Sequence, residues 1–379
     1  MRLTVICEAQ SFGYGPISKL LVVARQLAKE GLRLVLMGST TSLELAEQTP
    51  YFEEIVIVNT DSEEEIRRCH ALMRNSEAVV TVMNPVVARV TRQLPKPLVV
   101  LDSLFWKWDS IPEDFRHAHL YCIQNFIGVP QRLEEEGNRI DHPQLVGPII
   151  EPSLAPSPFQ PDRMERLIVN FGGFCASSVT ADANSTYPLL VTSLLLQSRL
   201  LSQFQEIVFV SCAATSRLLH EHFGSSRARF ATLSHDDMLK ALVSSNLLLT
   251  SPGLTTTLEA FMAGVPTVFL PPQNYSQYWI LKKLRQQELA PVSYHWDDLP
   301  MTLPVSERME RAAGIKLVLK GLEYFGNSQQ AQHDFIRTYE SVLDADLAKL
   351  REAQHSFAAS LGSNGVVTVV QQIKDLIGS

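Results

Sequence analysis

SHDDMLKALVSSNLLLTSPGLTTTLEAFMAGVPTVFLPPQNYSQYW, residues 234–279, is the stretch of sequence that decides the fold. Residues 246–250, with three leucines at their centre, predict a buried strand, Gly253 follows in a turn, and residues 255–263 predict a helix. A second apolar strand, residues 265–270, comes next. Alternation of strand, helix and strand predicts a parallel sheet with right-handed crossovers.

The start of the predicted helix has the composition of an anion-binding site. A helix N-terminus presents N–H groups without helical partners and the positive end of the helix dipole, and the hydroxyls of Thr255, Thr256 and Thr257 add donors. Glu259 lies one turn further in, where a carboxylate would repel phosphate. We therefore expect Glu259 to accept hydrogen bonds from ribose hydroxyls just beyond the phosphates. The structural alternatives involve no ligand: the three threonines would only cap the helix, and Glu259 would only complement the helix dipole.

The loop after this second strand is rich in amides. Gln273, Asn274 and Gln277 offer donors and acceptors of the kind that hold sugar hydroxyls, and solvated loop amides are the alternative. Upstream, Ser234 or Asp236 can cap the helix that begins in SHDDM.

The same alternation extends along the whole chain. Residues 16–30 predict the clearest helix, with one apolar face, Pro16 in its first turn and Gly31 at its end. Residues 147–161 are proline-rich and predict a linker. Apolar patterns also predict strands at residues 3–7, 32–37, 54–58, 78–82, 98–101, 119–123, 167–171 and 207–210, and helices near residues 85, 187–202, 236–244, 275–287, 328–354 and 365–377. Two Rossmann-like α/β domains in series follow from this order, with ligands expected in an interdomain cleft at the carboxyl ends of both sheets.

Composition excludes several classes of protein. The 379 residues carry a net charge of −7, which argues against a general nucleic-acid binder. No apolar run reaches the roughly 18–20 residues of a transmembrane segment. The five cysteines are scattered without a CxxC pair, which argues against a structural zinc and fits a reducing compartment. We expect a cytoplasmic protein without a metal.

Residues 233–279 resemble the nucleotide-binding half of GT-B glycosyltransferases. The similarity is closest to the bacterial UDP-N-acetylglucosamine-dependent transferases of lipid-linked peptidoglycan precursor synthesis and their relatives. The shared order is an acidic DDM loop, a strand, a glycine-led helix with Thr and Glu, a GxPxxxxP segment and a Gln-rich loop ending in QYW. The resemblance implies an acceptor-binding domain at residues 1–150, a nucleotide-sugar-binding domain at residues 162–350, and a terminal helix, residues 365–377, that packs back on the first domain.

The resemblance also assigns the donor site. The ligand would be a UDP-sugar or another NDP-sugar, bound as substrate and without a cofactor. The backbone at His235 would face the base, and Glu259 would bind the ribose. Gln277, with Gln273 or Ser276, would bind the sugar hydroxyls. The pyrophosphate would lie against Gly253, Leu254, Thr255 and Thr256.

A second glycine turn, NFGGF at residues 170–174, follows the first strand of the second half. Gly172 and Gly173 allow close approach of the backbone to a diphosphate or an acceptor, and a plain tight turn is the alternative. Ser177 or Ser178 could add contacts to the pyrophosphate.

The loop after the first strand, residues 8–16, departs from the family. Phe12, Gly13 and Tyr14 would lie beside the acceptor, but Pro16 or its neighbours stand where many relatives carry a catalytic histidine. A base is still required within hydrogen-bond reach of the attacking group.

Asp102, at the end of strand 98–101, is the first candidate for this base. Tyr14, Asp109 and Glu8 are the others. The nearby segment LFWKWD, residues 104–109, places aromatic rings around Asp102 that would raise its pKa, and Trp106 would stack on the acceptor. Core packing is the alternative for the tryptophans.

The predicted function is metal-independent, inverting transfer of a sugar from a UDP-sugar to a small acceptor such as an aglycone or nucleobase. The aromatic segment 104–109 favours such an acceptor over a lipid-linked one, since no basic cluster lies on the first domain. A nucleotide-sugar epimerase or hydrolase of the same fold, and a non-catalytic nucleotide-sugar-binding partner protein, are the alternatives.

Overall fold

The computed structural model describes residues 2–156, 164–173 and 181–378. The chain divides into two compact units, the first formed by Met1–Ser153 together with Leu361–Ser379, the second by Leu154–Ser360. Within the described residues, no helix is both long and apolar enough to cross a membrane.

The first unit contains a seven-stranded, all-parallel sheet with the order β3-β2-β1-β4-β5-β6-β7. Its strands are β1 (Thr4–Ala9), β2 (Arg33–Gly38), β3 (Glu54–Ile57), β4 (Ala78–Val82), β5 (Leu98–Asp102), β6 (Leu120–Gln124) and β7 (Pro143–Val146). The order reverses between β1 and β4, which is the topological switch point of a doubly wound fold. Apolar runs buried on both faces predicted these central strands, and the α/β prediction is confirmed.

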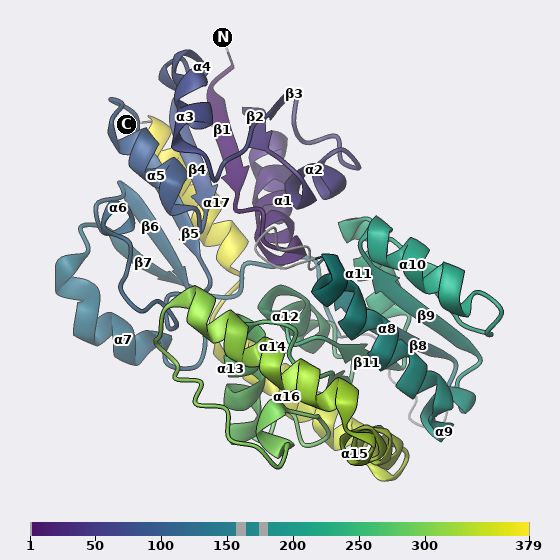
Figure 1. Cartoon of the computed structure of the whole chain (residues 1–379). Coiled ribbons are helices and arrows are strands. Elements are labelled where there is room, and N and C mark those ends of the chain that lie inside the picture. Colours follow the sequence, from purple (N-terminus) through teal and green to yellow (C-terminus); the bar gives the residue numbers. More distant parts are fainter. Residues whose placement is uncertain (1, 157–163, 174–180, 379) are drawn as a thin grey trace. The chain divides into compact units, whose positions relative to one another are not determined.

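Helices cover both faces of this sheet. They are α1 (Tyr14–Lys29), α2 (Thr41–Ala46), α3 (Glu63–Arg68), α4 (His70–Arg74), α5 (Pro85–Arg92), α6 (Glu113–Arg116), α7 (Val129–Glu136) and α17 (Gly365–Gly378). On one face, α1 and the terminal helix α17 pack against each other and on the sheet (Figure 1). On the other, Ile6 of β1 packs with residues of α3, α4 and α5. Helix α1 starts two residues before the predicted position because Gly13, with a φ of 70°, turns the chain there.

The second unit contains a five-stranded, all-parallel sheet with the order β10-β9-β8-β11-β12. Its strands are β8 (Arg166–Gly172), β9 (Glu206–Ser211), β10 (Arg229–Ala231), β11 (Leu247–Thr250) and β12 (Thr267–Phe269). Its helices are α8 (Ala181–Gln197), α9 (Arg199–Ser202), α10 (Ala213–Phe223), α11 (His235–Val243), α12 (Leu254–Met262), α13 (Tyr275–Gln286), α14 (Arg311–Asn327), α15 (Gln329–Glu340) and α16 (Leu347–Ser360). Both units are therefore Rossmann-like, as the sequence predicts.

Two helix predictions in this unit are wrong in detail. Residues 187–202 form two helices, because Ser198 takes an extended conformation and its hydroxyl bonds the Leu195 carbonyl at 2.8 Å. The predicted helix 328–354 is also two helices, α15 and α16, separated by a short 3-10 turn at Ser341–Asp344.

Candidate functional site

Helix α12 begins directly beyond the carboxyl end of β11. Gly253 is its N-cap and offers no side chain to the first turn. The first helical bond runs from the Thr257 N–H to the Gly253 carbonyl at 3.0 Å, so the N–H groups of residues 254–256 point out of the helix end. Thr255 is buried and Thr256 is half-buried at this end. The first turn of α12 thus combines backbone donors, two hydroxyls and the positive end of the helix dipole.

Gly253 leaves this helix end open. Its φ of −85° suits any residue, and a Cβ placed on it would meet only the Ser251 carbonyl oxygen, at 3.9 Å. Neither backbone conformation nor packing within the described residues therefore requires glycine here. The absence of a side chain at Gly253 leaves space beside the first turn of α12.

The predicted glycine turn at residues 172–173 lies at the same edge of the sheet. Strand β8 pairs with β11, with Asn170 opposite Thr250, and Asn170 Nδ2 donates to Thr250 Oγ1 at 3.0 Å. Asn170 Oδ1 accepts from the Gly172 N–H at 3.0 Å, and Gly172 has a φ of 67°, which favours glycine. Gly173 is buried just beyond it. Ser177 and Ser178 lie outside the described residues.

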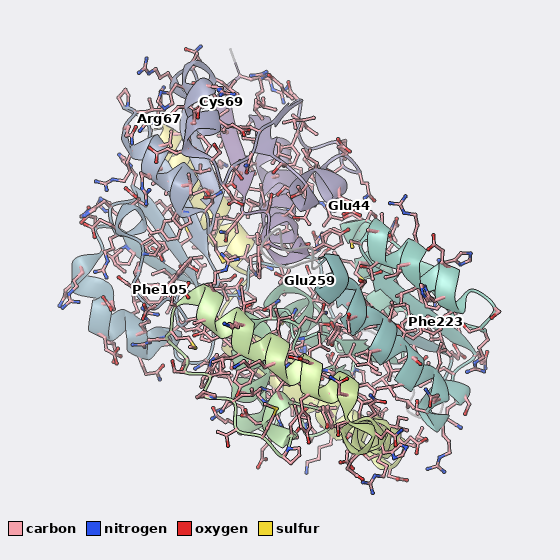
Figure 2. The ribbon with its side chains drawn as sticks, in the orientation of Figure 1. Glu44, Arg67, Cys69, Phe105, Phe223 and Glu259 are labelled. Atoms are coloured by element: carbon pink, nitrogen blue, oxygen red, sulfur yellow. The ribbon has the colours of Figure 1, made fainter. Side chains whose placement is uncertain are left out.

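A buried hydrogen bond between side chains joins the two helices α11 and α12. His235, the first residue of α11, places Nε2 2.8 Å from Glu259 Oε1 of α12, and both side chains are at most 5 % exposed. Figure 2 labels Glu259 on α12. The N-cap of α11 is Ser234, whose hydroxyl accepts from the Asp237 N–H at 3.1 Å and so fixes where the helix starts. The sequence predicts a role for the backbone of His235, facing the base, but does not predict the contact between its side chain and Glu259.

The predicted sugar-binding amides are already engaged with neighbouring groups. Gln273 Nε2 donates to the Phe171 carbonyl at 2.9 Å and to the Ser251 hydroxyl. Gln277 Oε1 accepts from the Gln273 N–H at 2.8 Å, and its own N–H donates to the N-cap Asn274. These bonds bring the loop before α13 against the ends of β8 and β11. Among the described residues, Gln277 Nε2 has no hydrogen-bond partner, which leaves it available to a ligand.

In the first unit, Asp102 ends β5 and is fully buried. Its Oδ1 accepts from the Leu104 N–H at 2.7 Å, while its Oδ2 accepts from Trp108 Nε1 at 2.7 Å and from the Tyr121 hydroxyl at 2.6 Å. Burial raises the pKa of Asp102, and these donors together with the Arg132 charge oppose the rise. The geometry fixes the plane of this carboxylate.

The residues predicted to contact an acceptor differ in exposure. Phe12 and Tyr14 are half-buried, and Gly13 is buried at the N-cap of α1. Trp106 is only 1 % exposed and packs on Phe126, with ring centroids 5.8 Å apart. Its indole is therefore part of the core of the unit.

Glu8 is a second buried carboxylate at the carboxyl edge of this sheet. Its Oε2 accepts from the Thr81 hydroxyl at 2.6 Å and its Oε1 from Asn84 Nδ2 at 2.8 Å. Burial raises the pKa of Glu8 to about 7, with the hydrogen bonds from Thr81 and Asn84 opposing the rise. Within the part of the chain that the structure describes, no three His, Cys, Asp or Glu side chains gather as metal ligands would.

Comparison with known proteins identifies the fold. No protein-family model matches the chain, and no curated protein matches it in sequence. MurG from Acinetobacter baumannii is 16 % identical, with a TM-score of 0.51 over 98 % of this chain and 99 % of that one. Os79 from O. sativa, solved in complex with UDP, is 12 % identical, with a TM-score of 0.57 over 98 % of this chain and 100 % of that one.

UGT2 from Phytolacca americana, complexed with UDP-2-fluoro-glucose and pterostilbene, is 14 % identical, with a TM-score of 0.57 over 99 % of both chains. Similarity of this extent over the full length shows that the chain has the GT-B fold, with two Rossmann-like domains. The fold prediction is confirmed.

Proposed function

We propose that this protein is a glycosyltransferase that moves a sugar from a UDP-sugar to a small-molecule acceptor. The observation that carries the proposal is the N-terminus of α12 at the carboxyl edge of the second sheet. A Cβ on its N-cap Gly253 would have no close neighbour, β8 ends beside β11 in the Gly172 turn, and Glu259 is buried one turn into the helix. Structures of the same fold hold UDP, a UDP-sugar analogue and a small aromatic molecule, which supports this class of substrates.

Each part of the donor has a proposed partner. The diphosphate lies against the N–H groups that follow Gly253 and the hydroxyls of Thr255 and Thr256, because a helix N-terminus favours anions. The ribose hydroxyls donate to Glu259, and the base faces the backbone at His235. The sugar hydroxyls form hydrogen bonds with Gln273 and Gln277. Nε2 of Gln277 is available as a donor, because it has no hydrogen-bond partner among the described residues.

The proposed reaction is a direct displacement with inversion. The acceptor nucleophile forms a bond to the anomeric carbon while the bond from that carbon to the diphosphate oxygen breaks, and UDP leaves with the electron pair. Backbone N–H groups and the dipole of α12 stabilise the charge that develops on the diphosphate, so the proposed mechanism uses no metal. The acceptor proton passes to a base on the first unit.

Asp102 is the proposed base. Its Oδ1 takes a single hydrogen bond, from Leu104, and so keeps a lone pair for the proton. Trp108 and Tyr121 hold Oδ2 and fix the orientation of the carboxylate. Glu8, whose pKa lies near 7, is another candidate, beside Tyr14 and Asp109.

We place the reaction in the cytoplasm, since the four described cysteines form no disulfide.

Incubation with a panel of UDP-sugars, with and without aromatic acceptors, tests this function. Release of UDP only when an acceptor is present, and unchanged by EDTA, is the expected result. UDP release without an acceptor would indicate a hydrolase, and conversion of the donor to its sugar epimer would indicate an epimerase. Binding of UDP without turnover would indicate a non-catalytic partner protein.

A further inference from the structure

The buried pair His235 and Glu259 has a consequence for substrate recognition that goes beyond the assignment of Glu259. The two residues are 24 positions apart and belong to different helices, α11 and α12. Their side chains meet at 2.8 Å, with exposed fractions of 5 % and 2 %. A buried carboxylate is costly unless it is hydrogen-bonded, and this contact supplies such a bond.

The direction of the hydrogen bond follows from the chemistry of the partners. An ionised carboxylate only accepts, so Nε2 of His235 carries the proton and donates to Oε1. Among the described residues, no other group donates to Glu259. The contact therefore occupies one oxygen, fixes the plane of the carboxylate and leaves Oε2 to accept from elsewhere.

We propose that His235 is a positioning residue that orients Glu259 toward the ribose diol of the nucleotide, and thereby makes the site selective for ribonucleotides over 2′-deoxyribonucleotides. The inference rests on the proposed function. A carboxylate held in one plane loses less conformational freedom when the diol binds, so its bonds to the hydroxyls contribute more to affinity. Without the imidazole, Glu259 would need another partner for Oε1 and would turn away from the diol.

The start of α11 makes this arrangement rigid. Ser234 caps the helix through the Asp237 N–H, which fixes the backbone of His235. On the opposite side, Glu259 stands in the second turn of α12, in a helix whose Leu258 and Ala260 are fully buried. Both ends of the hydrogen bond are thus attached to packed helices and not to loops.

Binding of UDP and of 2′-deoxy-UDP by calorimetry tests the proposal. For the unaltered chain, UDP is expected to bind at least tenfold more tightly than 2′-deoxy-UDP. His235→Leu, which fills the space without a donor, is expected to weaken UDP binding about tenfold and to remove the preference. His235→Gln, whose amide N–H can reach Oε1 in place of Nε2, is expected to restore most of the preference.

Two further variants separate positioning from general damage. Lys240→Ala removes an exposed side chain of α11 that pairs with Asp237 and contacts neither His235 nor Glu259, and it should keep the ribose preference. In a Glu259→Ala background, His235→Leu should cost no further UDP affinity. An equal loss of preference in Lys240→Ala, an equal cost of His235→Leu in the Glu259→Ala background, or no rescue by His235→Gln would overturn the proposal. Failure of the unaltered chain to bind UDP would instead reject the proposed function.

Discussion

The side chain of Asn84 connects strand β1 to helix α5 in the first unit. Its Nδ2 donates to Glu8 Oε1 of β1 at 2.8 Å, while its Oδ1 accepts from the N–H of Val86 at 2.9 Å and caps α5. The carboxylate of Glu8 is consequently fixed at the point where β1 and β4 diverge. Its pKa, raised by burial to about 7, makes the stability of this unit sensitive to pH.

Glu8→Gln is expected to change the pH dependence of stability. The pKa of Glu8 rises from 4.5 in the unfolded chain to about 7 in the fold, so the protonated form is the one that the fold favours. Protonated Glu8 therefore contributes to the free energy of unfolding. This contribution is complete below pH 4.5 and is lost as the pH rises through about 7, a change of about 3 kcal/mol. Urea unfolding at pH 5.5 and pH 8 should show a smaller loss on going to pH 8 in Glu8→Gln than in the unaltered chain.

Glu64→Gln is the matched control for Glu8. Glu64 is an exposed acid paired with Arg68 on the surface of α3, so its replacement should change the free energy of unfolding little at either pH. Parallel pH curves for the unaltered chain and for Glu8→Gln would contradict the assignment of the titrating group.

Glu259→Ala is expected to weaken UDP binding by about 1–3 kcal/mol, the loss typical of a hydrogen bond to a buried charged group. Calorimetry on the folded variant measures it. Glu206→Ala, at the opposite end of β9 from the proposed site, is a control that removes a partly buried acid paired with Arg166 and should leave UDP affinity unchanged. Equal UDP affinity in the unaltered chain and Glu259→Ala would exclude the ribose contact.

Gly253→Ala is expected to separate ligand binding from folding. The new Cβ would lie 3.9 Å from its nearest neighbour and the backbone angle is ordinary, so the melting temperature should stay within a few degrees. The methyl group would occupy the approach to the N–H groups of α12, and UDP affinity should fall at least tenfold. Uridine, which lacks the diphosphate, should bind equally to both forms. Unchanged UDP affinity would place the diphosphate elsewhere.

Asp102→Asn is expected to abolish turnover and leave UDP affinity nearly intact, because the base acts on the acceptor. In the variant, the amide NH2 group would face one of the groups that donate to the carboxylate of Asp102. Two donors cannot bond each other, so the free energy of unfolding should also fall by about 1–3 kcal/mol. Initial rates and calorimetry on the folded fraction measure both effects.

Tyr121→Phe provides the test specific to a base. The Tyr121 hydroxyl lowers the pKa of Asp102, so its removal should raise that pKa and shift the acidic limb of the pH–rate profile to higher pH. Full turnover in Asp102→Asn would assign Asp102 a structural role and leave Glu8, Tyr14 and Asp109 as candidates for the base.

The sequence predicts those parts of the fold in which one local pattern is sufficient. Continuous apolar runs identified β1 and β5, and the helical spacing of apolar residues identified α1, because buried parallel strands and amphipathic helices need those patterns. Strand β10, Arg229–Ala231, is short, lies at the edge of its sheet and is partly exposed, so no such pattern marks it. The pairing of His235 with Glu259 depends on how two helices pack, which spacing along the chain does not encode.

Helix α14 is a third example of what the local pattern misses. Its sequence, RAAGIKLVLKGLEYFGN, contains three glycines, which disfavour a helix, and no helix is predicted there from local pattern. Gly314 and Gly321 are both buried, and Cβ atoms at these positions would lie within 3 Å of the rings of Tyr275 and Trp296. Tertiary contact therefore requires glycine at positions where helix propensity disfavours it.

Gly314→Ala is accordingly expected to destabilise the second unit, although alanine is the better helix former. The added Cβ would lie 2.6–2.8 Å from the ring carbons of Tyr275. That ring cannot move aside freely, because its hydroxyl shares its one proton between the carbonyl oxygens of Ser306 and Glu307, at 2.8 and 2.7 Å. Overpacking of this kind costs about 1–3 kcal/mol, against a gain in helix propensity of about 1 kcal/mol.

Gly326→Ala, in the same helix, is the matched control for this overpacking. Gly326 is exposed and its Cβ would make one ordinary contact, 3.7 Å from Leu190 Cδ2, so only the helix-propensity gain remains and stability should rise slightly. Thermal unfolding of the two variants should therefore move in opposite directions. If Gly314→Ala stabilised the chain as Gly326→Ala does, the close packing of α14 against Tyr275 at the start of α13 would be wrong. The anchoring of Gln277 in that helix, and of Gln273 in the loop before it, would then be wrong as well.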